Sequence, residues 1–146
     1  MKLPTQCRLW KKKQLTNQDL DLHENFDVMH TFTDASHHAR KLLKCKECGQ
    51  LYFYEYYEKI DWATGNDPQY STFIPIDTED KTKLFKDLSP LELMGYPRIQ
   101  WDWPIKEGEP DARWAPGFAD NPKFEQNIKE LKEFEKEIEQ SYHNNH

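Results

Sequence analysis

Two cysteines with a two-residue spacing, Cys45 and Cys48, are the residues of this sequence best suited to carry chemistry. Two thiolates at this spacing in a tight turn can bind the same tetrahedral zinc ion. Gly49 follows directly and permits the left-handed backbone of such a turn, which aims backbone N–H groups at the sulfur atoms. The pattern therefore predicts a metal site, with zinc as the metal, in a turn between two strands.

A tetrahedral zinc site needs two further ligands, and the chain has no second Cys-x-x-Cys pair to supply them. Cys7 is the first choice, because a third thiolate is the softest ligand left in the sequence. His38 is the second choice, since it lies just before the strand that delivers Cys45. The predicted ligands are thus Cys7, His38, Cys45 and Cys48, and three further histidines stay open as ligands: His23, His30 and His37.

Four protein ligands would leave no open position for water, so the predicted zinc is structural. A site with three protein ligands would instead admit a catalytic water, with Glu47 or Glu55 as the base. The cysteines would otherwise be ordinary reduced thiols in a hairpin. A redox pair is less favoured, because thioredoxin-like pairs open a helix in a βαβ unit, whereas strands flank this pair.

The segment around the two cysteines resembles one knuckle of a zinc ribbon. The stretch Cys48–Glu55, of sequence Cys-Gly-Gln-Leu-Tyr-Phe-Tyr-Glu, is also similar to a segment of small uncharacterised bacterial proteins. The resemblance extends over residues 36–76. It implies a zinc knuckle in a hairpin, and it carries no activity with it.

Strands are predicted on both sides of the cysteine pair. Residues 51–60 are dense in Tyr, Phe and Ile, which indicates a long central strand with aromatic side chains on both faces and with Phe53 buried. A strand over residues 70–76 returns alongside it and should end near Pro75, because proline has no N–H to donate. Before the cysteines, a period of two predicts a strand with four side chains on one face: Phe26, Val28, His30 and Phe32. The opening of the chain is interpreted as an edge strand followed by a loop.

Helices are predicted in the second half of the chain. Residues 78–88 fit a short helix that buries Leu84, Phe85 and Leu88, and residues 121–142 show the best helical repeat of the sequence. The Gly-, Pro- and Trp-rich segment 95–118 has no period and is expected to be irregular, pinned by Trp101, Trp103 and Trp114. Together these elements predict an α+β fold, in which a small antiparallel β-sheet with a zinc knuckle is packed by a long C-terminal helix. We expect one domain over residues 1–146.

Charge is spread unevenly along the 146 residues, whose net charge is -6. Residues 1–60 carry 10 basic and 8 acidic residues, and residues 61–146 carry 10 basic and 18 acidic ones. General nucleic-acid binding is therefore disfavoured. A local basic surface remains an alternative, and it would be formed by the following residues: Arg8, Lys11, Lys12, Lys13, Arg40, Lys41, Lys44 and Lys46.

The compartment predicted from the sequence is a reducing cytoplasm. The start has no apolar signal-peptide region, and no apolar run approaches the length of a membrane span. Three cysteines, an odd number, do not suggest a disulfide framework.

The acidic second half favours a basic partner, because complementary charge speeds association and aromatic anchors supply affinity. One acidic stretch follows the predicted strand: Glu55, Glu58, Asp61 and Asp67. The leading hypothesis is a non-catalytic, zinc-stabilised protein-binding domain, immunity- or antitoxin-like, with a basic protein as partner. The alternatives are a nucleic-acid-binding zinc module that uses the basic N-terminal third, and a small zinc metalloenzyme.

Overall fold

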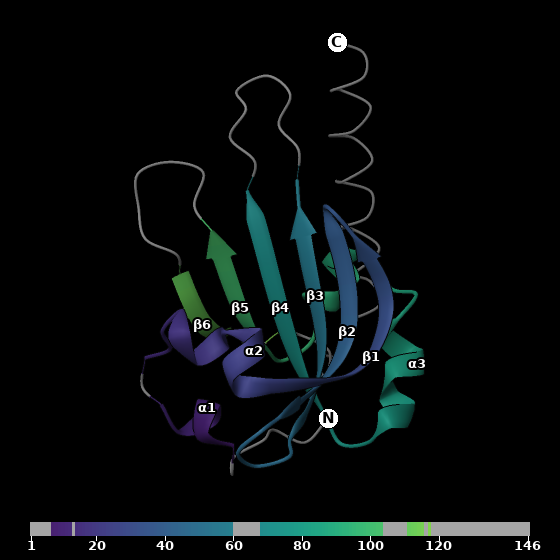
Figure 1. Ribbon diagram of the computed structural model, residues 1–146. Coiled ribbons are helices and arrows are strands. Elements are labelled where there is room, and N and C mark those ends of the chain that lie inside the picture. The colour runs from purple at the N-terminus through teal and green to yellow at the C-terminus, as the bar shows by residue number, and fades with distance from the viewer. Residues whose placement is uncertain (1–6, 13, 60–67, 104–110, 116, 118–146) are drawn as a thin grey trace, which may run out of the picture.

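The computed structural model describes residues 7–12, 14–59, 68–103, 111–115 and 117. Within them, six strands form one antiparallel sheet whose spatial order is the chain order. The strands are β1 (Phe26–Ala35), β2 (His38–Cys45), β3 (Leu51–Glu58), β4 (Gln69–Ile76), β5 (Arg98–Trp103) and β6 (Asp111–Ala115). The helices are short: α1 (Arg8–Lys11), η1 (Gln18–Leu20), α2 (Leu22–Asn25), η2 (Glu79–Lys81), α3 (Thr82–Phe85) and α4 (Pro90–Leu93). The described part of the chain is therefore mostly β, an open sheet flanked by helical turns (Figure 1).

The central strand β3 separates two cores, as its aromatic density predicts. Tyr52 and Tyr54 pack into one cluster, and Phe53, fully buried, packs into another. Because successive side chains of a strand point to opposite faces, the two clusters lie on the two faces of the sheet. We call the face of Tyr52 the thiol face, since Cys45 lies on it, and the face of Phe53 the α3 face. The prediction of a doubly covered strand with Phe53 buried is confirmed.

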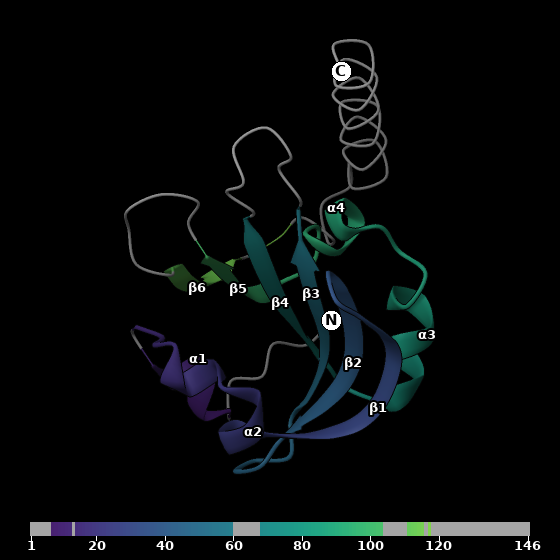
Figure 2. The ribbon, with the colours of Figure 1, turned by 45° about the horizontal axis from the view of Figure 1, so that its top comes forward.

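Different helices cover the two faces. Leu9 from α1, Leu20 from η1 and Leu22 from α2 join the cluster on the thiol face. On the α3 face, Phe85 from α3 and Leu93 from α4 join the other cluster. Figure 2 shows α1 and α2 on one side of the curved sheet and α3 on the other.

Two predictions about the N-terminal quarter are wrong. The opening segment forms α1 in place of an edge strand, and its buried residue Leu9 packs onto the sheet. β1 does carry the predicted strand, but Phe26 belongs to the thiol-face cluster and Phe32 packs on the α3 face. The physical reason is the irregular register of β1. A shift between Val28 and His30 inserts Met29 and places His30 opposite Leu42 of the α3 face, and a second shift between Thr31 and Thr33 inserts Phe32.

The helical turns after β4 agree with the sequence in part. Phe85 is buried as predicted and Leu88 is partly buried, but Leu84 is 50% exposed. The difference arises because the predicted helix is broken into η2 and α3, so that one regular stripe does not extend along it. α4 begins after Ser89, whose side chain accepts from the backbone N–H of Glu92 in a capping box.

The described residues of the segment 95–118, namely 95–103, 111–115 and 117, are not irregular, contrary to the prediction. It contains β5 and β6, and Trp101 and Trp114 pack from these strands against the thiol-face cluster. Each strand is short, five or six residues, so period-two alternation has little length in which to appear. The antiparallel sheet of the predicted fold is confirmed, and the predicted C-terminal helix over 121–142 lies outside the described residues.

Candidate metal centre

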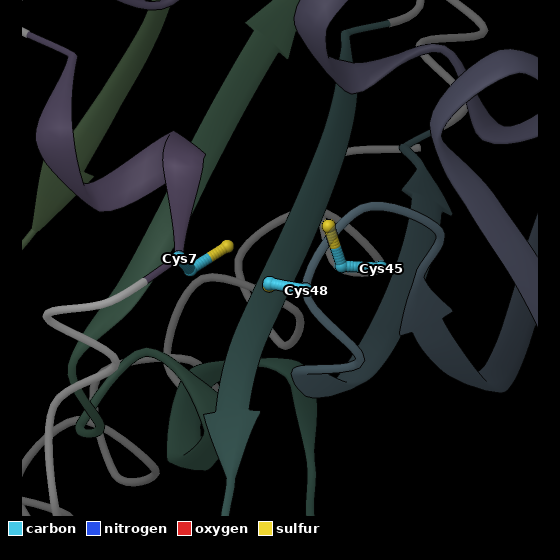
Figure 3. A group of neighbouring side chains, drawn as sticks. All are labelled: Cys7, Cys45 and Cys48. Atoms are coloured by element: carbon cyan, nitrogen blue, oxygen red, sulfur yellow. The ribbon is translucent and has the colours of Figure 1, made fainter.

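Three cysteines converge at the end of the sheet where the turn between β2 and β3 lies. The Sγ atoms of Cys7, Cys45 and Cys48 all lie within 4.8 Å of one another (Figure 3). Cys7 and Cys45 are each 1% exposed, whereas Cys48 is exposed. Three sulfur atoms at this separation could bind one metal ion, and the open side of the site is that of Cys48.

The turn between β2 and β3 brings two of the cysteines together. The N–H of Gly49 donates to the carbonyl of Cys45 at 2.9 Å, and the N–H of Cys45 donates to the carbonyl of Gln50 at 2.8 Å. Gly49 has a φ of 79°, in the left-handed region that an L side chain rarely adopts. The glycine predicted to close the knuckle therefore does so.

The thiols of this knuckle differ in their electrostatic environment. Burial alone would raise the pKa of Cys45, but the backbone N–H groups of Cys48 and Glu47 reverse this effect, and the pKa falls below its usual value. Burial and the neighbouring sulfur atoms of Cys7 and Cys45 raise the pKa of Cys48 to about 12. Three thiolates this close repel one another, and a divalent cation among them would favour the charged form of all three.

Cys7 comes from a distant part of the sequence and directly precedes α1. Its carbonyl accepts from the N–H of Trp10 at 3.0 Å, which makes Cys7 the N-cap residue of the helix. The Tyr52 hydroxyl donates to Cys7 Sγ at 3.0 Å, and burial together with this sulfur raises the pKa of Tyr52. The sulfur is thus positioned by the central strand of the sheet.

Polar contacts fasten α1 and α2 to the knuckle. Arg8 Nε lies 3.2 Å from Glu47 Oε2, and Arg8 Nη2 donates to Asn25 Oδ1 at 2.6 Å. The N–H of Lys46 donates to the carbonyl of Asn25 at 2.9 Å, and Lys46 Nζ donates to the carbonyl of His23 at 2.8 Å. The elements that surround the three sulfur atoms therefore form one hydrogen-bonded unit.

The structure does not bring His38 together with the cysteines. His38 and Cys45 are the two ends of the eight-residue strand β2, which at about 3.3 Å per residue are roughly 20 Å apart. His38 Nε2 lies 3.0 Å from Glu55 Oε2, and His37 Nδ1 lies 3.1 Å from Glu58 Oε1 at the same end of the sheet. His30 follows the face reversal of β1, and its ring lies 4.5 Å from that of Phe32.

His23 has a different position from the other described histidines. It lies on α2, the helix whose backbone is hydrogen bonded to the knuckle, and its side chain is exposed. Its ring is not part of the three-sulfur group.

The α3 face contains a buried ion pair that was not predicted from the sequence. Arg40 and Glu55, 5% and 3% exposed, are paired across β2 and β3, with Arg40 Nη2 at 2.6 Å from Glu55 Oε2. Arg40 Nη1 also donates to the carbonyls of Phe85 and Lys86. Arg40 is therefore not part of a basic surface and Glu55 is not part of an acidic one. Complementary charges at 40 and 55 were visible in the sequence, but only the strand register shows that they pair.

Comparisons with known proteins identify no family for this chain: no family model, no curated protein and no solved structure matches it. Among the described residues, none of the helices has both the length and the apolar composition needed to cross a membrane.

Proposed function

We propose that this chain is a non-catalytic, zinc-stabilised binding domain whose partner is a basic protein. The observation that carries the proposal is the convergence of three cysteines from two distant parts of the sequence on one point. Thiolates are soft ligands that select zinc over the harder calcium and magnesium ions. The ion would fasten α1 to the knuckle, and its binding free energy would add to the folding free energy.

A structural role fits the surroundings of the three sulfur atoms better than a catalytic one. Glu55, one of the two bases considered for a catalytic water, is buried against Arg40 on the opposite face of the sheet. Glu47, the other, lies on the knuckle itself with its carboxylate 3.2 Å from Arg8. Each carboxylate is thus already engaged by an arginine side chain.

The position of α2 beside the knuckle favours His23 as the fourth ligand. Residues 1–6, which precede Cys7, include no cysteine, histidine, aspartate or glutamate. Of the described histidines, His23 is the one whose helix is hydrogen bonded to the knuckle. An exposed imidazole on that helix can turn toward the open side of the site, where Cys48 lies.

The partner is proposed from the charge at the opposite end of the sheet. β3 ends at Glu58, which is paired in register with Gln69 of β4, and Gln69 is paired with Trp103 of β5. The two connections that leave this end, 59–68 and 104–110, include four carboxylates against Lys59 and Lys106: Asp61, Asp67, Glu107 and Glu109. We call Glu58 and these two connections the acidic end, and a basic protein is the complementary partner.

The nucleic-acid alternative is less well supported. Of the basic residues in the N-terminal third, Arg40 is buried against Glu55, and Arg8 and Lys12 are paired with Asp19. Cations engaged in this way are less available to phosphate groups.

Metal analysis of the purified full chain tests the zinc site. About one zinc ion per chain is expected, and Cys7→Ser, Cys45→Ser and Cys48→Ser should each lose it. Cobalt-substituted protein reports the fourth ligand, because the visible ligand-field bands change when an imidazole is replaced by water. His23→Ala should change these bands, and His30→Ala, its matched control, should not. Metal-free wild-type protein with an unchanged melting temperature would refute the site.

Association measurements test the partner. Proteins retained by the tagged chain from an extract of its native host should be basic, and association with one of them should slow steeply between low and physiological salt. Glu58→Gln should slow association, whereas Asp80→Asn, an exposed residue of η2 at the other end of β4, should not. Salt-independent association, or retention of nucleic acid in place of protein, would contradict the proposal.

A further inference from the structure

One row of side chains on the thiol face alternates small and large across five strands. The register pairs Ala39 with Tyr56, Tyr56 with Ser71, Ser71 with Trp101, and Trp101 with Ala112. Paired residues of neighbouring strands point to the same face, so all five side chains lie on the face of the thiol cluster. The two aromatic residues are therefore separated by one strand whose residue in the row, Ser71, is small.

The distance between the strands of this row would suit a cation bound between the Tyr56 and Trp101 rings. Neighbouring strands lie about 4.8 Å apart, so the backbones of Tyr56 and Trp101 are separated by about 10 Å. A cation is attracted to an aromatic ring within about 6 Å of the ring centroid, so one cation between the two rings can meet both limits. Ser71 is buried beneath, and both aromatic residues are only partly buried.

Negative charge lies directly beside the Tyr56 ring. The Tyr56 hydroxyl donates to Glu58 Oε2 at 2.9 Å, and the other carboxylate oxygen lies 3.1 Å from His37 Nδ1. Glu58 belongs to the acidic end, so the row lies next to the surface proposed to attract a basic partner. Aromatic faces combined with a carboxylate are the chemistry that recognises ammonium and guanidinium groups.

The Trp101 side chain also carries a hydrogen-bond donor that is not satisfied by any described residue. Its indole Nε1 is buried and has no hydrogen-bond partner among the described residues. A buried donor without an acceptor costs free energy, so the Trp101 side chain is not optimally satisfied in the unbound protein. In Figure 1 the described helices cross the lower half of this face, and none of them lies over the upper half of β3, β4 and β5.

We propose that Tyr56 and Trp101, with Glu58 beside them, form a clamp for a lysine or arginine side chain of the partner. This inference rests on the proposed basic partner and names the group on that partner which the chain recognises. Tyr56 and Trp101 supply the two rings, Ser71 is the small residue between them, and Glu58 supplies the opposite charge.

A deca-lysine peptide and its fully acetylated form, which lacks the charges, are the probes. Wild-type protein should bind deca-lysine at low ionic strength and should not bind the acetylated peptide. Tyr56→Leu removes a ring and leaves the net charge unchanged, so binding should weaken about two- to fivefold, the range for one exposed cation–π contact. Tyr56→Phe, which keeps the ring, should retain most of the affinity. Tyr57→Leu is the matched control, because Tyr57 lies next along β3 and stacks with Tyr70 on the α3 face.

The indole N–H resonance of Trp101, assigned by its loss in Trp101→Phe, gives a second readout and should move during the titration. The outcomes separate the two proposals. Binding of deca-lysine that Tyr56→Leu leaves unchanged, with the Trp101 resonance unmoved, would overturn the clamp and leave the basic partner standing. Absence of deca-lysine binding by wild-type protein would overturn the basic partner, and the clamp with it.

Discussion

The two faces of the sheet are covered in the same way but held by different chemistry. Each face carries helices of three or four residues, too short to be stable alone, so each set depends on the sheet. On the α3 face, Phe53 packs against Phe85 and Arg40 reaches from its ion pair to the carbonyls of Phe85 and Lys86. On the thiol face, α1 is held by hydrogen bonds, and Cys7 at its N-cap joins the three-sulfur group.

The difference lies in what each face requires from outside the chain. Side-chain packing and a buried ion pair need nothing but the folded protein. The proposed zinc site needs a cation from outside the chain, since without one the raised pKa of Cys48 keeps its thiol protonated. The stability of the α3 face should therefore be independent of zinc, whereas the stability of the thiol face should fall when zinc is removed.

The largest effect is expected from Phe53→Ala, which opens a cavity in the core of the α3 face. A loss of about 3–5 kcal/mol in the free energy of unfolding is expected, the usual range for a core Phe. Because the change lies on the α3 face, the loss should be the same with and without zinc. Denaturant unfolding checks this, and a loss below about 1 kcal/mol, typical of surface changes, would contradict the assignment of the face.

Removal of zinc should have a comparable effect through the other face. With free zinc at a thousandfold excess over its dissociation constant, metal binding stabilises the folded state by about 4 kcal/mol. Chelation should lower the melting temperature of wild-type protein and leave that of Cys7→Ser unchanged, and added zinc should restore only the wild type. Equal responses of both proteins would remove the proposed dependence of the thiol face on metal.

Glu55→Gln should lower the free energy of unfolding, because it leaves Arg40 buried on the α3 face without its anionic partner. The expected loss is about 3 kcal/mol, near the lower limit for an unpaired buried charge. Zinc content should stay at the wild-type level, because the pair lies on the face opposite the sulfur atoms. A double variant with Arg40→Met, which removes both charges, should recover part of the loss. Failure to recover would mean that the hydrogen bonds from Arg40 to Phe85 and Lys86 dominate.

Asp19→Asn should have the smallest effect and should depend on pH. Burial opposes the charge of Asp19, but contacts from Lys12 and Thr16 outweigh it and hold the pKa of this carboxyl below its usual value. A lowered pKa in the folded state stabilises the fold at neutral pH, and this contribution is lost as the pH falls through the folded pKa. The variant should therefore cost about 1 kcal/mol at pH 7 and converge with the parent only when the pH falls below the lowered pKa of Asp19. Melting curves of both proteins with chelator present, which separates this effect from metal release, check the convergence.

Features set by a few neighbouring residues could be predicted from the sequence. The Cys45–Gly49 knuckle depends on local spacing and on one glycine, and β3 is marked by its own aromatic density. Cys7 could be assigned to the three-sulfur group because the chain has only three cysteines and a tetrahedral metal site needs more than two ligands. In each case the signal lies within the element or in the residue type itself.

Features set by pairing between strands could not be predicted. The inserted residues Met29 and Phe32 change the faces along β1, and periodicity does not reveal an insertion that only the partner strand defines. The Arg40–Glu55 pair and the row from Ala39 to Ala112 exist only in register. His38 was selected because it is near Cys45 in sequence, whereas an extended strand carries sequence neighbours far apart in space.

The irregular course of β1 has a further consequence for how the chain behaves at high concentration. β1 is an outer strand of an open sheet and, at ten residues, is long enough to template the addition of a second chain. Its register shifts twice, between Val28 and His30 and between Thr31 and Thr33, and each shift bends and twists the strand. A bent edge offers no straight row of N–H and C=O groups to an incoming strand, although Val28 and Met29 are exposed there. The same register shifts that change the faces along β1 thus protect the protein from edge-to-edge aggregation.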